Sequence, residues 1–204
     1  MPDGLGSRIT EISGTALPIR GNDIDTDRIV PARYLKEVTF DRMGEYPFFD
    51  ERFDANGNPR PHPFNDPKYQ GASILLANAN FGSGSSREHA PQALYRFGIH
   101  AIVGESFAAI FTGNSLAIGL PTVTVSHDDM ERLMAAVEAK PELKLSLDLS
   151  EKCLVFDGGV IPVEVSEMAR KSLAEGYWDS TSTLAANMPK VRQVAARLPY
   201  LNGF

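Results

Sequence analysis

The sequence predicts an α/β fold with a layer of parallel strands, and two patterns carry this prediction. Two short apolar stretches, at residues 73–77 and 101–103, have the composition of strands buried on both faces, and residues 121–125 form a third expected strand. Segments with helical periodicity separate them, at residues 90–97 and 106–117. Because strand, helix, strand, helix, strand in this order favours parallel pairing, we expect a sheet flanked by helices.

Further elements are expected on both sides of this layer. Residues 8–19, 143–149 and 153–156 have the patterns of strands. A Gly-Gly turn at residues 157–159 predicts a hairpin. Ser126 is a suitable N-cap for one more helix, whose apolar residues recur on one face.

We divide the chain into one domain, residues 8–175, between a loose tail at residues 1–7 and a helical extension at residues 176–204. The extension carries a final helical segment that is interrupted at Pro189. Inside the domain, residues 36–70 form a long excursion rich in Pro, Asn, Asp, Gly and aromatic residues. Loops of this length are usually functional or mobile, and we expect the aromatic residues to pack against another part of the fold.

Composition and charge exclude several classes of protein. Hydrophobic residues make up 43% and charged residues 23% of the 204 residues, which is typical of globular domains and not of disordered chains. The net charge of −6 gives no general attraction to nucleic acid or to acidic membrane surfaces, so we expect neither as a partner. No apolar run approaches the length of a membrane-spanning helix.

The single cysteine, Cys153, limits redox and metal chemistry. One thiol cannot form an internal disulfide, and alone it cannot hold a zinc ion or an iron–sulfur cluster. The four histidines are scattered without paired spacing, so we expect no metal site. Because residues 1–17 lack the pattern of a signal peptide, we expect the protein in the reducing cytoplasm.

The run from Gly82 to His89, Gly-Ser-Gly-Ser-Ser-Arg-Glu-His, is the strongest candidate for a functional site. It leads from a predicted strand into a predicted helix that begins at about Ser86. At such a place free backbone N–H groups and the helix dipole attract anions. Ser85 and Ser86 add hydroxyl donors, and the guanidinium of Arg87 can bind a carboxylate through two parallel hydrogen bonds.

From the residues alone, two interpretations of this loop stay open. Either it binds an anion, or a serine only caps the helix while Arg87 pairs with Glu88 or another surface acid. Walker and dinucleotide loops are excluded, because the first requires Lys before Ser or Thr and the second requires a third glycine. His89 lies four residues after Ser85, and a structural hydrogen bond is favoured there over a catalytic Ser–His pair.

A second polar cluster spans residues 23–28 and contains alternating acidic side chains. Counted from Asp23, an EF-hand loop requires Gly at position six and Glu at position twelve, where Arg28 and Tyr34 stand. Calcium binding is therefore not expected. The favoured interpretation is an acidic loop that accepts hydrogen bonds from its own backbone amides.

Three segments closely resemble one known family. Residues 25–35 (DTDRIVPARYL), 69–77 (YQGASILLA) and 80–91 (NFGSGSSREHAP) are similar to motifs of the small subunits of 3-isopropylmalate dehydratase, in the aconitase superfamily. The resemblance runs from about residue 8 to residue 175. Ser83 departs from it, since many relatives are expected to have Cys there, but that position is not a cluster ligand in the family.

The resemblance implies a swivelling β/β/α domain of the aconitase superfamily, with a mixed or parallel sheet flanked by helices. It implies a lyase of leucine biosynthesis that interconverts 2-isopropylmalate and 3-isopropylmalate by dehydration and rehydration through 2-isopropylmaleate. It also implies that this chain binds no cofactor itself. The [4Fe-4S] cluster would lie on a separate large subunit, and the substrate, a small hydroxy-dicarboxylate, would be bound in the heterodimer.

The same motifs imply roles for single residues. Ser85 would be the general base that takes the carbon-bound proton as an alkoxide, and Ser86 and Arg87 would hold a substrate carboxylate. Thr26 and Asp27 would support the active site, with Asp27 orienting a histidine of the partner.

Substrate choice in the superfamily is attributed to the loop after the first motif, here Tyr34, Leu35, Lys36, Glu37 and Val38. Leu35 and Val38 favour an apolar isopropyl group, whereas Lys36 leaves room for a further carboxylate. The alternatives are therefore the same chemistry on homoaconitate or a methylated malate, or a stand-alone carboxylate-binding module. A Ser–His hydrolase is disfavoured because the Gly-x-Ser-x-Gly context is incomplete.

Overall fold

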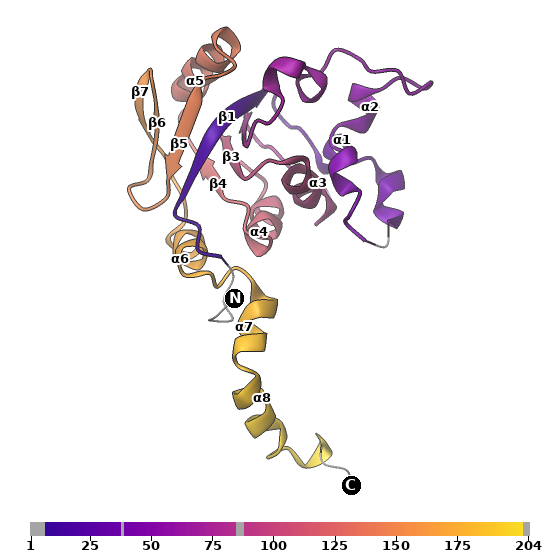
Figure 1. Ribbon diagram of the computed structural model, residues 1–204, viewed down its shortest axis with the longest axis vertical. Helices are drawn as coiled ribbons and strands as arrows, with labels where there is room; N and C mark the ends of the chain where they lie inside the picture. The colour runs from indigo at the N-terminus through magenta and orange to yellow at the C-terminus, as the bar shows by residue number, and fades with distance from the viewer. Residues whose placement is uncertain (1–6, 38, 85–87, 202–204) are drawn as a thin grey trace.

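The computed structural model describes residues 7–37, 39–84 and 88–201, which form a seven-stranded mixed sheet covered by helices (Figure 1). The spatial order of the strands is β4-β3-β2-β1-β5-β6-β7. The strands are β1 (Glu11–Ile19), β2 (Ile74–Ala77), β3 (Ala101–Gly104), β4 (Thr122–Thr124), β5 (Lys144–Asp148), β6 (Cys153–Phe156) and β7 (Gly159–Pro162). The predicted α/β class with a mixed or parallel sheet is confirmed.

Strand β1 joins a parallel half of the sheet to an antiparallel half. Its first five residues pair antiparallel with β5, and its last four, from Ala16, pair parallel with β2. The burial of β1 changes at the same point, from alternating to continuous. Pro18 is tolerated in this central strand because β5 ends its pairing at Thr15, so on that side the proline needs no backbone N–H.

The helices occupy most of the predicted segments. They are α1 (Thr26–Ile29), α2 (Phe49–Arg52), α3 (His89–Phe97), α4 (Ala109–Ala117), α5 (His127–Ala139), α6 (Glu167–Glu175), α7 (Ser180–Ala186) and α8 (Met188–Ala195). Ser126 caps α5 as expected, since its side chain accepts a hydrogen bond from the Asp129 amide. Gly98, in the left-handed conformation, ends α3.

The excursion at residues 36–70 is ordered by its aromatic side chains. The Tyr34 and Tyr46 rings stack with centroids 4.0 Å apart, and Phe48 is fully buried. Gly44 lies so close to α3 that a Cβ there would be 2.6 Å from the Arg96 carbonyl oxygen. The expectation that these aromatic residues pack against another part of the fold is confirmed. The excursion forms α2 and the 3-10 turns Met43–Glu45, Pro63–Asn65 and Pro67–Tyr69.

Two helix boundaries differ from the sequence prediction. Helix α3 begins at His89 rather than at about Ser86, and residues 85–87 lie outside the described part of the chain. The C-terminal helical segment is interrupted at Asn187 and not at Pro189. Pro189 lies in the first turn of α8, where its missing N–H would have no helical partner in any case.

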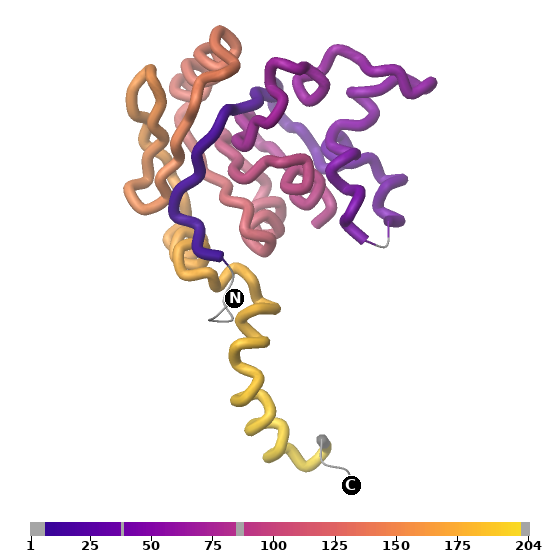
Figure 2. Tube along the Cα trace, in the orientation of Figure 1, coloured from indigo at the N-terminus to yellow at the C-terminus, as the bar shows by residue number. Residues whose placement is uncertain are grey.

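Helices α7 and α8 project away from the sheet (Figures 1 and 2). Among the described residues, no helix combines the length and the hydropathy needed to cross a bilayer.

The core predicts a clear stability contrast between β2 and β7. Leu76 is fully buried in β2, so Leu76→Ala should lower the free energy of unfolding by about 2–5 kcal/mol through lost burial and a residual cavity. Val160 of β7 is 61% exposed, so Val160→Ala should change it by less than about 1 kcal/mol. Urea unfolding of both variants measures the difference. Equal losses would contradict the assigned burial.

Candidate active site at the carboxyl ends of the parallel strands

Three loops meet at one edge of the sheet because β1, β2 and β3 are adjacent and parallel. They are residues 20–25 after β1, residues 78–88 after β2 and residues 105–108 after β3. In open α/β sheets ligands bind at the carboxyl ends of the strands. Both polar segments selected from the sequence, residues 23–28 and Gly82–His89, therefore belong to the edge where a site is expected.

The first two loops stay paired after their strands have ended. An isolated parallel bridge joins Asp25 and Ser83. The backbone hydrogen bonds are Asp23 N to Ala79 O (2.9 Å), Gly82 N to Ile24 O (2.7 Å) and Thr26 N to Ser83 O (2.8 Å). The acidic segment is thus held directly against the Gly-Ser loop, which sequence separation could not show.

Both loops contain a strained residue at corresponding positions. Asp23 and Asn80 have positive φ angles, 57° and 56°, which cost non-glycine residues about 1 kcal/mol each. The Asn80 side-chain amide donates a hydrogen bond of 2.8 Å to the Asp23 carboxylate, which ties the two turns together. Strain of this kind persists where the surroundings impose a particular backbone path.

The third loop completes the arrangement through Ser106. The Ser106 hydroxyl accepts a hydrogen bond of 2.8 Å from the backbone N–H of Asn80. The Ser106 backbone carbonyl accepts one of 3.1 Å from the backbone N–H of Phe81. Phe81 is buried and meets the Phe111 ring edge to face at 5.4 Å. The loop after β3 therefore sets the position of the loop after β2.

Two glycines allow the loop after β2 to approach its neighbours closely. Gly82 has φ +78°, and a Cβ there would lie 2.3 Å from Phe111 Cγ. Gly84 has φ +101°, and a Cβ there would lie 3.2 Å from the Thr26 hydroxyl. Both positions require glycine for its backbone conformation, and Gly82 requires it for space as well.

The residues expected to act chemically are close in sequence to these anchors. Ser85, Ser86 and Arg87 fall outside the described residues, between Gly84 and the start of α3. Thr26 is buried beside Gly84, whereas Asp27 is exposed in α1.

Helix α1 starts at Thr26 because the Asp25 carboxylate accepts a hydrogen bond of 2.8 Å from the Arg28 amide. Asp25 thus uses a backbone amide of its own segment, as the favoured interpretation of this acidic loop expected.

The expected specificity loop is attached to the same region. Tyr34 stacks on Tyr46, and the Tyr46 hydroxyl donates a hydrogen bond of 3.0 Å to Glu37. Leu35 is half-buried and Lys36 is exposed, while Val38 lies outside the described residues. Just after this loop, the Phe40 ring contacts the His89 ring at the start of α3, with centroids 5.2 Å apart. The loop is therefore held near the beginning of the helix that follows the Gly-Ser run.

A charged cluster next to these loops was missed by sequence reasoning. Glu105, His127 and Glu131 bring potential metal-ligand atoms within 4.8 Å of one another, although the histidine spacing predicted no metal site. Their charges are already compensated: Arg20 pairs with Glu131 at 2.9 Å, and His127 lies 3.2 Å from Glu105. The hydrogen bond to Glu105 raises the pKa of His127, and the hydrogen bond from Arg20 lowers the pKa of Glu131.

Asn78 connects this cluster to the site. Its side chain is 6% exposed, accepts a hydrogen bond from the Gly21 amide at 2.9 Å and donates one to Glu105 at 2.6 Å. One side chain thus links the loops after β1, β2 and β3. The only signal in the sequence is a polar residue directly after an apolar strand, which alone does not identify its partners.

Comparisons with known proteins identify the family of this chain. Residues 7–128 match the family described as the aconitase C-terminal domain. A 3-isopropylmalate dehydratase small subunit from Thermus thermophilus is 52% identical over 193 residues, which cover 95% of this chain and 96% of that protein. The chain belongs to the family of 3-isopropylmalate dehydratase small subunits. The protein of that name from Synechocystis is 48% identical, and the match covers 96% of each chain.

A solved structure of similar fold supports the fold described for this chain. The crystal structure of 3-isopropylmalate dehydratase from Methanocaldococcus jannaschii superposes with a TM-score of 0.66 at 26% identity, covering 90% of this chain and 99% of that one. The family and the fold inferred from the three sequence motifs are therefore confirmed. All three motifs lie within the residues matched by the family model.

Gly82 gives a matched test of the close approach. Gly82→Ala should lower the free energy of unfolding by roughly 2–4 kcal/mol, since it adds a left-handed alanine and a clash with Phe111. Gly57 has a similar φ, +81°, and a Cβ there would meet nothing within 4 Å, so Gly57→Ala should cost only about 1–2 kcal/mol. Urea unfolding compares them. A loss of unfolding free energy for Gly82→Ala no greater than that for Gly57→Ala would contradict the close packing of Gly82 against Phe111.

Two histidines should titrate on opposite sides of their usual pKa of 6.5. Burial against Phe48 and Phe64 lowers the pKa of His62, whereas Glu105 raises that of His127. Because folded His62 resists protonation, the stability it contributes is present above pH 6.5 and is lost as the pH falls toward its folded pKa. NMR titration of the ring protons should show the His62 midpoint below 6.5 and the His127 midpoint above it. The reverse order would refute both environments.

Proposed function

We propose that this chain is the small subunit of a hydro-lyase that interconverts 2-isopropylmalate and 3-isopropylmalate in leucine biosynthesis. The observation that carries the proposal is that the described parts of two family motifs, residues 25–35 and 80–91, meet where β1 and β2 end. Similarity to named small subunits over 95% of the chain supports it. Water is removed to give 2-isopropylmaleate and is then added back with the hydroxyl on the neighbouring carbon.

The proposal includes a cluster-bearing large subunit. A [4Fe-4S] cluster needs several thiolate ligands, and the sequence contains only Cys153, at the start of β6 and separated from β1 by β5. The residues of this chain therefore do not fit such a cluster. Held by the partner, the cluster would supply Lewis-acid chemistry to the substrate hydroxyl. The lone thiol also favours a reducing compartment, and we place the complex in the cytoplasm.

Ser85 is the proposed base. As an alkoxide its Oγ takes the proton from one substrate carbon. When water is added back with its hydroxyl on that carbon, Ser85 gives the proton to the carbon that lost the hydroxyl. An ordinary serine hydroxyl is far too weak an acid to provide this alkoxide, so its anion must be stabilised. The amino end of α3, which begins at His89, and the guanidinium of Arg87 are suited to that task.

The neighbouring residues have binding and supporting roles in the proposal. Ser86 and Arg87 bind a substrate carboxylate through hydroxyl and guanidinium donors. Thr26 supports the loop: its amide donates to the Ser83 carbonyl, and its hydroxyl lies beside Gly84. Asp27 is exposed, as a residue that orients a partner histidine must be.

The substrate is proposed from the loop at residues 34–38. Leu35 offers apolar surface for an isopropyl group, and the exposed ammonium of Lys36 offers a charge for a carboxylate. The same chemistry on homoaconitate or a methylated malate is the second candidate, and Lys36 suits the additional carboxylate of homoaconitate.

Turnover in the reconstituted complex tests the proposal. Mixed with a cluster-bearing large subunit, the wild-type chain should isomerise 2-isopropylmalate, and Ser85→Ala should lower kcat by at least about a thousandfold while the complex still assembles. Ser83→Ala is the matched control, because Ser83 contributes its carbonyl, and not its side chain, to the bond with Thr26.

Full activity of Ser85→Ala would refute the assigned base. Faster turnover of homoaconitate or a methylated malate than of isopropylmalate would refute the proposed substrate but not the proposed dehydration and rehydration. Tight carboxylate binding by the isolated chain without turnover in any complex would support a stand-alone binding module and refute the enzyme.

A further inference from the structure

The C-terminal arm, defined as residues 180–201 with helices α7 and α8, has an apolar face that no other part of the described chain covers. In Figures 1 and 2 it extends away from the sheet. Its exposed apolar side chains lie at helical spacing, and their exposed fractions are between 41% and 62%. They are Leu184, Met188, Val191 and Val194. A helix with such a stripe normally buries it against a partner.

The arm is basic in an acidic protein. It contains Lys190, Arg192 and Arg197, and no acidic residue occurs from residue 180 to the end of the sequence. Since the whole chain has a net charge of −6, the remainder of the chain carries −9. The arm is therefore attracted to the surface of an acidic body, and two arms repel each other.

The base of the arm is fixed to its own body. The Trp178 ring packs on Gly119, where a Cβ would lie 2.9 Å from the ring, and its Nε1 donates a hydrogen bond of 2.9 Å to the Ser7 carbonyl. Gly176 ends α6 in the left-handed conformation, and Asp179 caps α7 through the Ser182 amide. These contacts set the direction of the arm away from the domain from which it starts.

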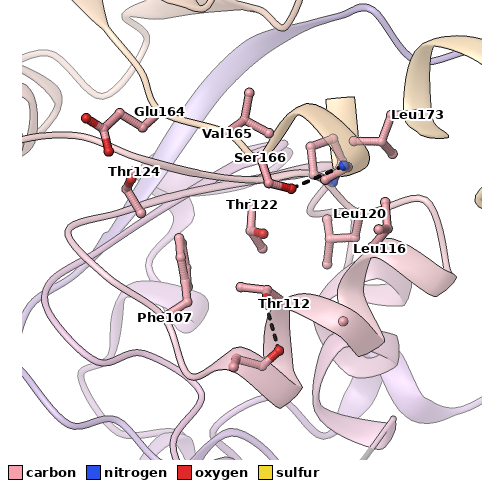
Figure 3. Close-up of a pocket in the computed structure, with 14 residues that line it drawn as sticks. Phe107, Thr112, Leu116, Leu120, Thr122, Thr124, Glu164, Val165, Ser166 and Leu173 are labelled. Atoms are coloured by element: carbon pink, nitrogen blue, oxygen red, sulfur yellow. Dashed lines mark hydrogen bonds between the residues drawn. The ribbon is translucent and has the colours of Figure 1, made fainter. Parts of the chain in front are cut away.

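A groove next to this base has the complementary character. It lies between α4, the edge strand β4 and α6, with a volume of about 510 Å³ (Figure 3). Leu116, Leu120, Val165 and Leu173 give it apolar walls, and the exposed carboxylate of Glu164 lies at its rim. Because its α6 wall leads directly into the arm, the groove and the arm are neighbours along the chain but not in contact.

We propose that the groove of one chain receives the apolar face of the arm of a second copy, so that two chains exchange arms around a twofold axis. Charge selects this pairing, since a basic arm meets an acidic body whereas two arms repel. Trp178 fixes the start of each arm to its own body, from which the arm extends away from the sheet (Figure 1). A reciprocal exchange closes after two chains and covers both arms and both grooves.

This proposal is tested on the isolated full-length chain, without a large subunit and without turnover, so its failure is separate from failure of the proposed enzyme. Sedimentation of the wild-type chain should show a dimer. Val191→Asp on the arm and Ala169→Trp in the groove should each raise the dimer dissociation constant at least tenfold. Gln193→Asp is the control, because it adds the same charge about 200° around the helix from Val191 and should leave the dimer intact.

Crosslinking identifies the pairing directly. In a Cys153→Ala background, ¹⁵N-labelled Val191→Cys chains and unlabelled Ala169→Cys chains are mixed and treated with a short bismaleimide. Mass spectrometry should find one labelled and one unlabelled chain in each product.

A monomer at every concentration, or a dimer that Val191→Asp and Ala169→Trp both leave unchanged, would overturn the proposal. So would a monomeric chain whose Val191→Asp substitution weakens only the affinity for the cluster-bearing subunit, because the arm would then belong to that interface.

Discussion

The structure depends most on the pairing that continues past the ends of β1 and β2. The bonds from Gly82 N to Ile24 O and from Thr26 N to Ser83 O carry the parallel ladder into two segments that the sequence separates by more than fifty residues. The pairing is possible only because Gly82 has no Cβ to meet Phe111. The described residues on either side of Ser85, Ser86 and Arg87 are Gly84, which follows this ladder, and Glu88, which precedes α3.

Around that pairing the protein uses polar groups to fix backbone positions. Asn80 stabilises the strained turn at Asp23, and Ser106 holds Asn80 from the other side. Asn78, one residue beyond β2, also fixes backbone positions, because its side-chain amide links the Gly21 backbone to Glu105. Such support is expected where reacting groups must keep their geometry while a partner closes over them.

Several elements followed directly from sequence patterns, and others could not. The apolar runs predicted β2 and β3, because burial on both faces leaves no room for polar residues. The order of the excursion was not predictable, since it depends on distant contacts such as Gly44 against Arg96. The Glu105–His127 pair joins two elements far apart in sequence, and no spacing rule detects it. For the site, the motifs located the loops and a family resemblance supplied the chemical roles.

Hydrogen–deuterium exchange of this chain tests the shared active site most directly. With both the cluster-bearing subunit and 2-isopropylmalate present, amides in residues 20–28, 79–84 and 105–108 should gain protection that neither addition alone produces in full. Amides of β6 and β7, on the far side of β5, should not change. Protection confined to β6 and β7, or none in the three loops, would contradict a substrate site built at the carboxyl ends of β1, β2 and β3.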